Sequence, residues 1–370
     1  MSGGRRRPRT VHIPCASVRT STASPPVAPG TLSGFDRRPM TIDPLELMER
    51  QHGLVLRRQL LAGGWPPALI DRKVASGEWT AIRRGVYICT VRWDAADEHV
   101  GRPLMRALAA SLSMLHPHVV SHDSAALIAG LPVLRTHRAL THITRYGVHG
   151  GRTRHGVKHH QAPFEPWMVE ESSGVPYFGI ARTAADLARE HGLHQGLVAF
   201  DAALAMGCRP ADLDAVVAGM RNWPQVTVVK ECRELATWGA ESPGESLTRL
   251  LLREMGEIAQ TQFGLMNGGR QVWSDLRVRR HLIEFDGRRK YRDESDLWDE
   301  KLREDFLRGL HLGISRVVWE DVNTPIAWCR TQKRLNTDIA RSDELYGRDL
   351  TGLEGLIIPD AVRLERIHRL

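Results

Sequence analysis

The chain has 370 residues, enough for two or three domains, and its 42% hydrophobic and 25% charged residues are typical of a globular protein. No apolar run is long enough to cross a bilayer, which argues against a transmembrane helix. The five cysteines are scattered without a C-x-x-C pair, which argues against a disulfide framework or a cysteine-built zinc site and fits a reducing cytosol.

The net charge of +8 comes mostly from residues 1–40, which hold seven arginines and one acidic residue. Of the 51 basic and 43 acidic residues in the whole chain, this leaves 44 and 42 for the remainder, so overall charge is not evidence for nucleic-acid binding. Residues 1–40 lack a hydrophobic period and are predicted to be disordered. They are either a basic tail that contacts phosphates or an extension that precedes a start at Met40, and they lack the apolar core of a secretory signal.

Residues 41–90 are predicted to form three short helices followed by a β-hairpin. The segment "WPPALIDRKVASG" opens with Pro66 and Pro67 and closes with Gly77, which is the usual asymmetry of a helix. The following "EWTAIRRGVYICT" alternates as a hairpin does. This order favours a winged helix-turn-helix, in which the third helix enters the DNA major groove and the hairpin, or wing, contacts the backbone.

The candidate DNA-binding residues are Arg72 and Lys73 on the third helix and Arg83 and Arg84 on the wing. Such side chains bond phosphates, and arginine also reads guanine edges. The alternative is that all four belong to a solvated charged surface, and winged helices also bind proteins. We expect double-stranded DNA as the partner of this segment and leave the individual contacts open.

The stretch "LLAGGWPPALIDRKVASGEWTAIRRGVYI" resembles the N-terminal domain of the AbiEi-type antitoxins, the transcriptional-repressor half of type IV toxin–antitoxin systems. Gly77, Trp79 and the run from Arg84 to Tyr87 carry the resemblance, which continues weakly into "SHDSAALIAGLP" and "GVPYFGIARTAADLAR". The resemblance implies DNA binding, autoregulation and a toxin partner of the nucleotidyltransferase type.

Residues 91–235 are predicted to form an α+β middle domain without a reactive constellation. Ser121, His122 and Asp123 are consecutive and cannot form a catalytic triad, and Ser121 is expected to cap the helix that follows. A His-rich segment that includes His142 and His160 has spacings that match no known metal-ligand pattern. Structural roles are therefore predicted throughout this domain.

The segment "VWSDLRVRRHLIEFDGRRKY" is the sharpest signal in the chain. A two-residue turn at Arg279-Arg280 predicts a hairpin of strands 272–278 and 281–286, in which Asp275 lies opposite Glu284. Directly opposed residues share a face, and strand alternation adds Asp286 to that face. The other face is apolar and carries Leu276, Val278, Ile283 and Phe285.

Three like charges on one face destabilise a hairpin unless something neutralises them. A divalent cation such as Mg²⁺ or Mn²⁺ can do so, and it would also activate water and stabilise the charge that develops in phosphodiester cleavage. Lys290, shortly after the second strand, is a candidate to orient water or phosphate. Alternatively, Arg277, Arg288 or Arg289 pairs with the acids in a surface salt-bridge lattice.

Residues 236–322, with the helix "ESPGESLTRLLLREMG" before the hairpin and "DLWDEKLREDFLRGLHLG" and "ISRVVWEDV" after it, resemble the restriction-endonuclease-like PD-(D/E)xK superfamily, in the branch of the very-short-patch repair endonucleases. The resemblance implies that Asp275 and Glu284 hold the metal ion and that Glu245 is the acid from the first helix. Asp286 stands where the superfamily has a lysine, so Lys290 or Lys301 would have to substitute. From the residues alone, Glu245 also fits a capping box that begins at Ser242.

The sequence therefore predicts a multidomain α+β protein: a winged helix-turn-helix at 41–90, an α+β middle domain at 91–235, a restriction-endonuclease-like α/β domain with a mixed sheet at 236–322, and a helical extension at 323–370. The leading hypothesis is a cytoplasmic, nucleoid-associated, Mg²⁺-dependent DNA endonuclease that its winged helix targets or regulates. The alternative is a non-enzymatic antitoxin or transcriptional repressor with a degenerate nuclease-like domain.

Overall fold

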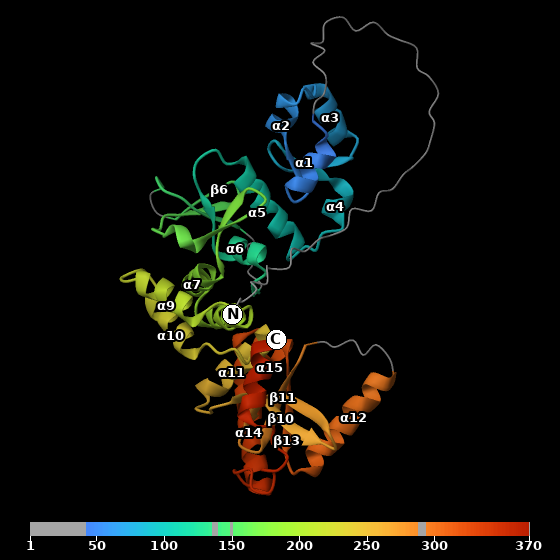
Figure 1. The fold of residues 1–370 in the computed structure, drawn as a ribbon, viewed down its shortest axis with the longest axis vertical. Coiled ribbons are helices and arrows are strands. Elements are labelled where there is room, and N and C mark those ends of the chain that lie inside the picture. The colour runs from blue at the N-terminus through green and yellow to red at the C-terminus, as the bar shows by residue number, and fades with distance from the viewer. Residues whose placement is uncertain (1–41, 135–139, 149–150, 288–293, 370) are drawn as a thin grey trace, which may run out of the picture. The chain divides into compact units, whose positions relative to one another are not determined.

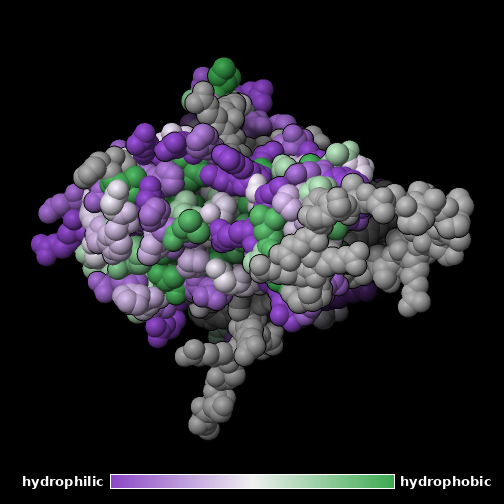
Figure 2. Space-filling model, turned by 90° about the horizontal axis from the view of Figure 1, so that it is seen from above, coloured by the Kyte–Doolittle hydropathy of each residue, from purple (hydrophilic) through white to green (hydrophobic). Residues whose placement is uncertain are grey.

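The computed structural model describes residues 42–134, 140–148, 151–287 and 294–369. The chain divides after Pro39, and all of these residues belong to the unit that begins at Met40, whereas the predicted tail lies outside them. Helices and three separate sheets alternate along the chain, which confirms the mixed α and β class (Figure 1). On the face drawn in Figure 2, hydrophobic side chains form small patches between hydrophilic ones. Within the described part, no helix has both the length and the apolar character to span a membrane.

The first sheet has three antiparallel strands in the order β1-β3-β2. The sequence prediction had three helices and a hairpin but missed β1, whose residues are all buried and therefore show no alternation. This strand pairs with β3, and Leu54 lies opposite Ile88. The elements are α1 (Pro44–Arg50), β1 (Leu54–Leu56), α2 (Arg57–Ala62), α3 (Pro67–Ala75), β2 (Trp79–Arg83), β3 (Val86–Cys89) and α4 (Thr90–Asp94).

The second sheet is mixed and has six strands in the order β6-β7-β5-β4-β9-β8. The pairs β5·β7 and β4·β9 are parallel, and the other neighbours are antiparallel. Its elements are α5 (Gly101–Ser113), β4 (Val119–Val120), α6 (His122–Ala129), β5 (Thr141–Thr144), β6 (Arg152–Arg154), β7 (Val157–His160), the 3-10 helix Pro166–Met168, β8 (Val169–Ser172) and β9 (Val175–Phe178). Four helices follow: α7 (Ile180–His191), α8 (Leu193–Ala205), α9 (Pro210–Gly219) and α10 (Val226–Leu235).

The third sheet has the order β10-β11-β12-β13, and only its last pair, β12·β13, is parallel. Helices α11 and α14 cover one face, where Leu251, Ile283 and Leu335 share a buried cluster, and α12 covers the other face (Figure 1). The elements are α11 (Pro243–Glu254), β10 (Gln260–Asn267), β11 (Arg270–Val278), β12 (His281–Asp286), α12 (Glu294–Gly309), β13 (Gly313–Val318), α13 (Trp319–Val322), α14 (Pro325–Tyr346) and α15 (Asp360–Arg369).

The predicted hairpin is confirmed in its turn and in most of its register. Strands β11 and β12 pair Val278 with His281, Arg277 with Leu282 and Leu276 with Ile283. The predicted apolar face is also confirmed, because Leu276, Val278 and Ile283 are buried together and Phe285 packs against them. The opposite face is less open than predicted: Leu282 is fully buried there against Phe263 and Leu307. On that face, Arg277 lies opposite Leu282 near the turn, and the acidic residues lie toward the other end of the hairpin.

Candidate functional site

Helix α11 approaches strand β12 through a glycine. A Cβ atom at Gly244 would lie 2.0 Å from the ring of Phe285, so a side chain at this position could not fit without movement. The start of the helix is fixed by Pro243 and by Ser242, whose Oγ accepts a hydrogen bond of 3.2 Å from the backbone nitrogen of Glu245. These constraints place Glu245 beside the hairpin.

Glu245 is buried, with 6% of its surface exposed. Its Oε2 accepts hydrogen bonds from the backbone nitrogen of Glu241 at 2.9 Å and from Nε2 of Gln262 at 3.5 Å. A complete capping box would have returned this carboxylate to Ser242, so the predicted box is only half formed. Burial, followed by the negative charge of Asp275, raises the pKa of Glu245 to about 7. The two acids therefore interact although they are thirty residues apart in the sequence.

Asp275 lies where the ladder between β11 and β12 opens. The predicted pair of Asp275 with Glu284 is not part of the ladder, because Oδ2 of Asp275 instead accepts a hydrogen bond of 2.8 Å from the backbone nitrogen of Phe285. Burial raises the pKa of Asp275 to about 6; the hydrogen bond from Phe285 opposes this shift, and the charge of Glu284 adds to it. Asp275 thus interacts electrostatically with Glu245 and with Glu284, without the predicted direct pairing across the strands.

Glu284 is neutralised by an arginine that the sequence analysis did not consider. Arg303, on α12, contacts both carboxylate oxygens of Glu284, and its Nη1 lies 3.2 Å from Oε2. The same guanidinium donates to the backbone oxygen of Trp273 at 2.7 Å. Arg277, the partner considered from the sequence, instead bonds Gln260. Glu284 therefore forms a salt bridge, as in the alternative kept open from the sequence, but with Arg303 in place of the arginines named there.

The remaining predicted site residues are less well placed. Asp286 is half-buried at the end of β12 and lies beside Val318 in the parallel register. Lys290 lies outside the described residues, as do Arg288 and Arg289, and Lys301 is exposed on α12. Arg303, and Arg366, whose Nη2 lies 3.1 Å from Oε1 of Glu241, bring positive charge to the acids.

The predicted DNA-contacting side chains lie on α3 and the β2–β3 hairpin. Arg72 and Arg84 are exposed, and no ion pair involving either is found among the residues that the structure describes. Lys73 is half-buried and paired with Glu78. Arg83 is also half-buried, and burial lowers its pKa. Arg72 and Arg84 are therefore the better candidates for phosphate contacts.

A second cluster of potential metal ligands consists of histidines and does not include the acidic residues described above. Across the described ranges, the group of three whose ligand atoms all lie within 4.8 Å of one another is His122, His142 and His160. From the sequence alone, these residues are expected to have structural roles. The parallel pairing of β5 and β7 is the feature that would have revealed the cluster, because it places His142 and His160 on the same face of two neighbouring strands.

No family model matches the chain, and no curated protein matches it.

Proposed function

We propose that the chain is a DNA-binding protein whose third sheet carries a Mg²⁺-dependent phosphodiester-cleaving site. The observation that carries this proposal is the shared burial of Glu245 and Asp275, whose pKa values are raised by burial and by neighbouring negative charge. Buried acids that repel one another are costly to a fold and are typical of functional sites.

The donor set fits a hard divalent cation. Within the described residues, Oε2 of Glu245 accepts hydrogen bonds from Glu241 and Gln262, and Oδ2 of Asp275 accepts one from Phe285. Both groups therefore bring carboxylate oxygens into the same buried region. Mg²⁺ commonly uses one or two carboxylates and completes its shell with water and phosphate oxygens. Glu245 and Asp275 would hold the ion, which would supply an activated water and charge stabilisation.

The surrounding residues have roles that follow from their contacts. Glu245, with a pKa near neutrality, is suited to accept a proton from water at physiological pH. Glu241 and Gln262 fix the orientation of its carboxylate. Arg303 is held between Glu284 and Trp273 and brings a positive charge to the site, which would attract a phosphate group.

Two further features support the proposal. The order α11-β10-β11-β12-α12-β13 around a mixed sheet agrees with the resemblance to the PD-(D/E)xK superfamily. The exposed Arg72 and Arg84 lie on a third helix and a hairpin, the elements with which winged helices contact DNA.

A second candidate is a non-enzymatic regulator of the AbiEi antitoxin kind, with double-stranded DNA and a nucleotidyltransferase-type toxin as partners. The contact of Arg303 with both oxygens of Glu284 favours this candidate, because the arginine already occupies a predicted metal ligand. Asp286 in place of the superfamily's lysine favours it as well.

Plasmid cleavage separates the two candidates. We expect the full-length protein with Mg²⁺ or Mn²⁺ to nick or linearise plasmid DNA, and we expect Asp275→Ala and Glu245→Ala each to lower the rate by about 100-fold or more, as loss of a charge-stabilising group does. The matched control is Asp214→Ala on α9, far along the chain from the acids, which should cleave normally.

The targeting role is measured in the same preparations. Arg84→Ala should cleave but bind duplex DNA more weakly, with a salt slope reduced by about one. DNA binding without cleavage by the wild-type protein would support the regulator instead. Cleavage that persists in both acid variants would remove the proposed site.

A further inference from the structure

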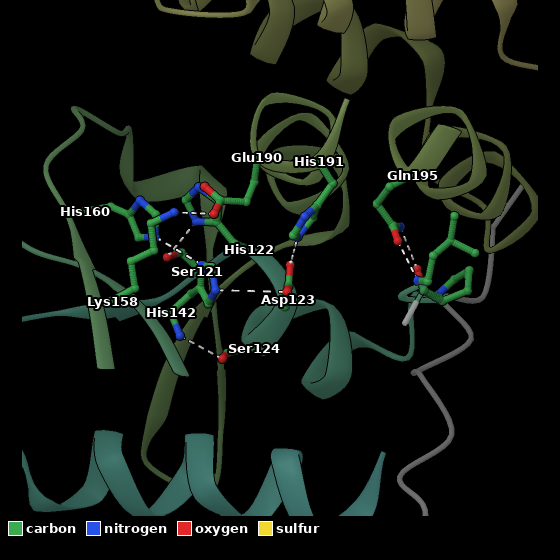
Figure 3. Close-up of polar contacts among 12 residues, drawn as sticks. Ser121, His122, Asp123, Ser124, His142, Lys158, His160, Glu190, His191 and Gln195 are labelled. Carbon is green, nitrogen blue, oxygen red and sulfur yellow. Dashed lines mark hydrogen bonds and ion pairs between the residues drawn. The ribbon is translucent and has the colours of Figure 1, made fainter. Parts of the chain in front are cut away.

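Three histidine side chains, two from the second sheet and one from helix α6, lie close together. His142 comes from β5, His160 from the end of β7, and His122 from the first residue of α6. Figure 3 shows their rings gathered together, with Lys158 and Glu190 alongside and Asp123 next to His191. His122 and His142 are buried, with 4% and 3% of their surfaces exposed, whereas His160 is half-buried. The half-buried ring leaves the cluster accessible from solvent.

Strand register and an unusual backbone conformation bring these three rings together. In the parallel register, His142 lies beside Lys158 and His160 lies beside Thr144, so the two histidines are diagonal neighbours on one face. His122 has a φ of 49°, a left-handed conformation that non-glycine residues rarely adopt. Strain of this kind persists where the surrounding structure holds a side chain in a required direction. Here it directs His122 toward the other two rings.

We propose that His122, His142 and His160 bind a divalent transition-metal ion of the zinc type through one imidazole nitrogen each. The ligand atoms all lie within 4.8 Å of one another, and Nδ1 of His142 is 3.1 Å from Nε2 of His160. Zn–N bonds of roughly 2.0–2.1 Å in tetrahedral geometry require ligand nitrogens about 3.3 Å apart. The observed pair is thus already near its bound spacing.

The partners of the other ring nitrogens agree with this assignment. Nδ1 of His122 lies 3.0 Å from Oγ of Ser121, and in the tautomer that donates to Ser121, Nε2 keeps a free lone pair. This contact also explains why Ser121 does not cap α6 as the sequence predicted. Nε2 of His142 faces Oδ2 of Asp123 at 4.0 Å, which is longer than a hydrogen bond, and Nδ1 faces His160. A small shift of the ring toward Asp123 would form the carboxylate–histidine contact that commonly supports a metal ligand.

The protonation state also suits metal binding. Burial, together with neighbouring positive charge, lowers the pKa of His142 and places that of His122 well below its ordinary value. Burial lowers the pKa of His160 to about 2. Burial therefore favours the neutral form of the three rings, which is the form that coordinates metal ions.

The chemistry of the ligands selects the class of ion. Imidazole nitrogens favour Zn²⁺ and other first-row transition ions, whereas Mg²⁺ and Ca²⁺ favour oxygen ligands. Three histidines leave a fourth position for water or another ligand. Binding would also open the stack of His122 on His160, whose centroids are 3.8 Å apart, because lone pairs on stacked rings run parallel rather than converge.

The test uses the tag-free, full-length chain, stripped of metal and titrated with Zn²⁺ against a chromophoric chelator. We expect one Zn²⁺ per chain in the wild-type protein and at least about tenfold weaker binding in His160→Gln and in His142→Gln. The matched control is His159→Gln, because His159 neighbours His160 on β7 but belongs to the opposite face and contacts Arg145. This variant should bind Zn²⁺ as the wild-type protein does.

A second control separates this site from the acids. Asp275→Asn should leave Zn²⁺ binding intact, so the inference stands or falls independently of the endonuclease proposal. The wild-type stoichiometry decides the matter even if a variant folds poorly: absence of a bound Zn²⁺ would overturn the proposal. Equal loss of binding in His159→Gln, or loss in Asp275→Asn, would overturn it too.

Discussion

Burial has opposite effects on the pKa values of the acidic residues at the third sheet and of the histidines at the second sheet. Burial of Glu245 and Asp275 brings like charges together and raises their pKa values. Burial of His122, His142 and His160 lowers their pKa values and so favours the uncharged imidazole. The two clusters differ in the ion that would suit them: a hard cation for the oxygens and a softer one for the nitrogens.

The two clusters also differ in how rigidly their ligands are held. Asp123 supports the histidines from behind: its Oδ1 lies 2.6 Å from Nε2 of His191, and its Oδ2 faces His142. On the acid side, Arg303 binds Glu284 directly and competes with any incoming ion. An ion at the histidine cluster would have to separate the stacked rings of His122 and His160, whereas an ion at the acid cluster would have to displace Arg303 from Glu284.

The largest expected effect concerns the negative charge of Asp123 next to the histidine cluster. Asp123→Asn removes the charge that orients His142 and should weaken Zn²⁺ binding about 10- to 100-fold, the usual effect of losing an outer carboxylate. Chelator competition gives the affinity. Asp214→Asn, an exposed carboxylate paired with Arg233, is the matched control and should have no effect. An unchanged affinity in Asp123→Asn would mean that the histidines need no outer partner.

A smaller effect concerns the raised pKa of Glu245. Because the folded-state pKa of about 7 exceeds the ordinary value of 4.5, the folded protein binds the proton more tightly than the unfolded chain does. This contribution to stability is complete below pH 4.5 and is lost as the pH rises through about 7. Between pH 5 and pH 8, metal-free wild-type protein should lose on the order of 1 to 3 kcal/mol relative to Glu245→Gln.

Denaturation curves of the two proteins at pH 5 and pH 8 give this difference. Mg²⁺ should restore stability to the wild-type protein at pH 8, because a cation at the acids replaces the lost proton. A pH-independent difference between the two proteins would show that Glu245 does not titrate in the folded state as inferred.

The smallest expected effect tests the occupation of the acids by Arg303. Arg303→Gln should lower the stability of the metal-free protein by about 1 kcal/mol, because Glu284 loses its counterion while remaining half-buried. The increase in Tm on adding Mg²⁺ should then be larger than in the wild-type protein. Arg308→Gln, an exposed arginine on the same helix paired with Glu304, provides the comparison. An equal Mg²⁺ response in both variants would remove the competitive role of Arg303.

The same contrast shows what the sequence could and could not predict. The hairpin of β11 and β12 was predictable because a two-residue turn fixes the register locally, and its apolar face followed from alternation. The contact of Arg303 with Glu284 could not be predicted. Arg303 follows Glu284 by nineteen residues, and the contact depends on how α12 packs on the sheet. The position of Glu245 beside Asp275 was expected only from a family resemblance.

The histidine cluster was beyond sequence reasoning for a related reason. His142 and His160 meet through parallel pairing of β5 and β7, and the sequence does not specify that register. His122 joins them through an unusual backbone conformation. Strand β1 was missed because three buried residues in a row have no period. Local geometry could therefore be predicted from the sequence, whereas contacts between elements far apart in the chain could not.

The close approach of Gly244 to Phe285 has a consequence for comparing sequences. Even alanine would place a carbon atom 2.0 Å from that ring, so α11 would have to shift away from the sheet and take Glu245 with it. A homologue that kept every acidic residue but replaced this glycine would retain the ligands and lose their spacing. When related sequences are sorted into active and inactive members, this small residue should therefore be weighed as heavily as the acids themselves.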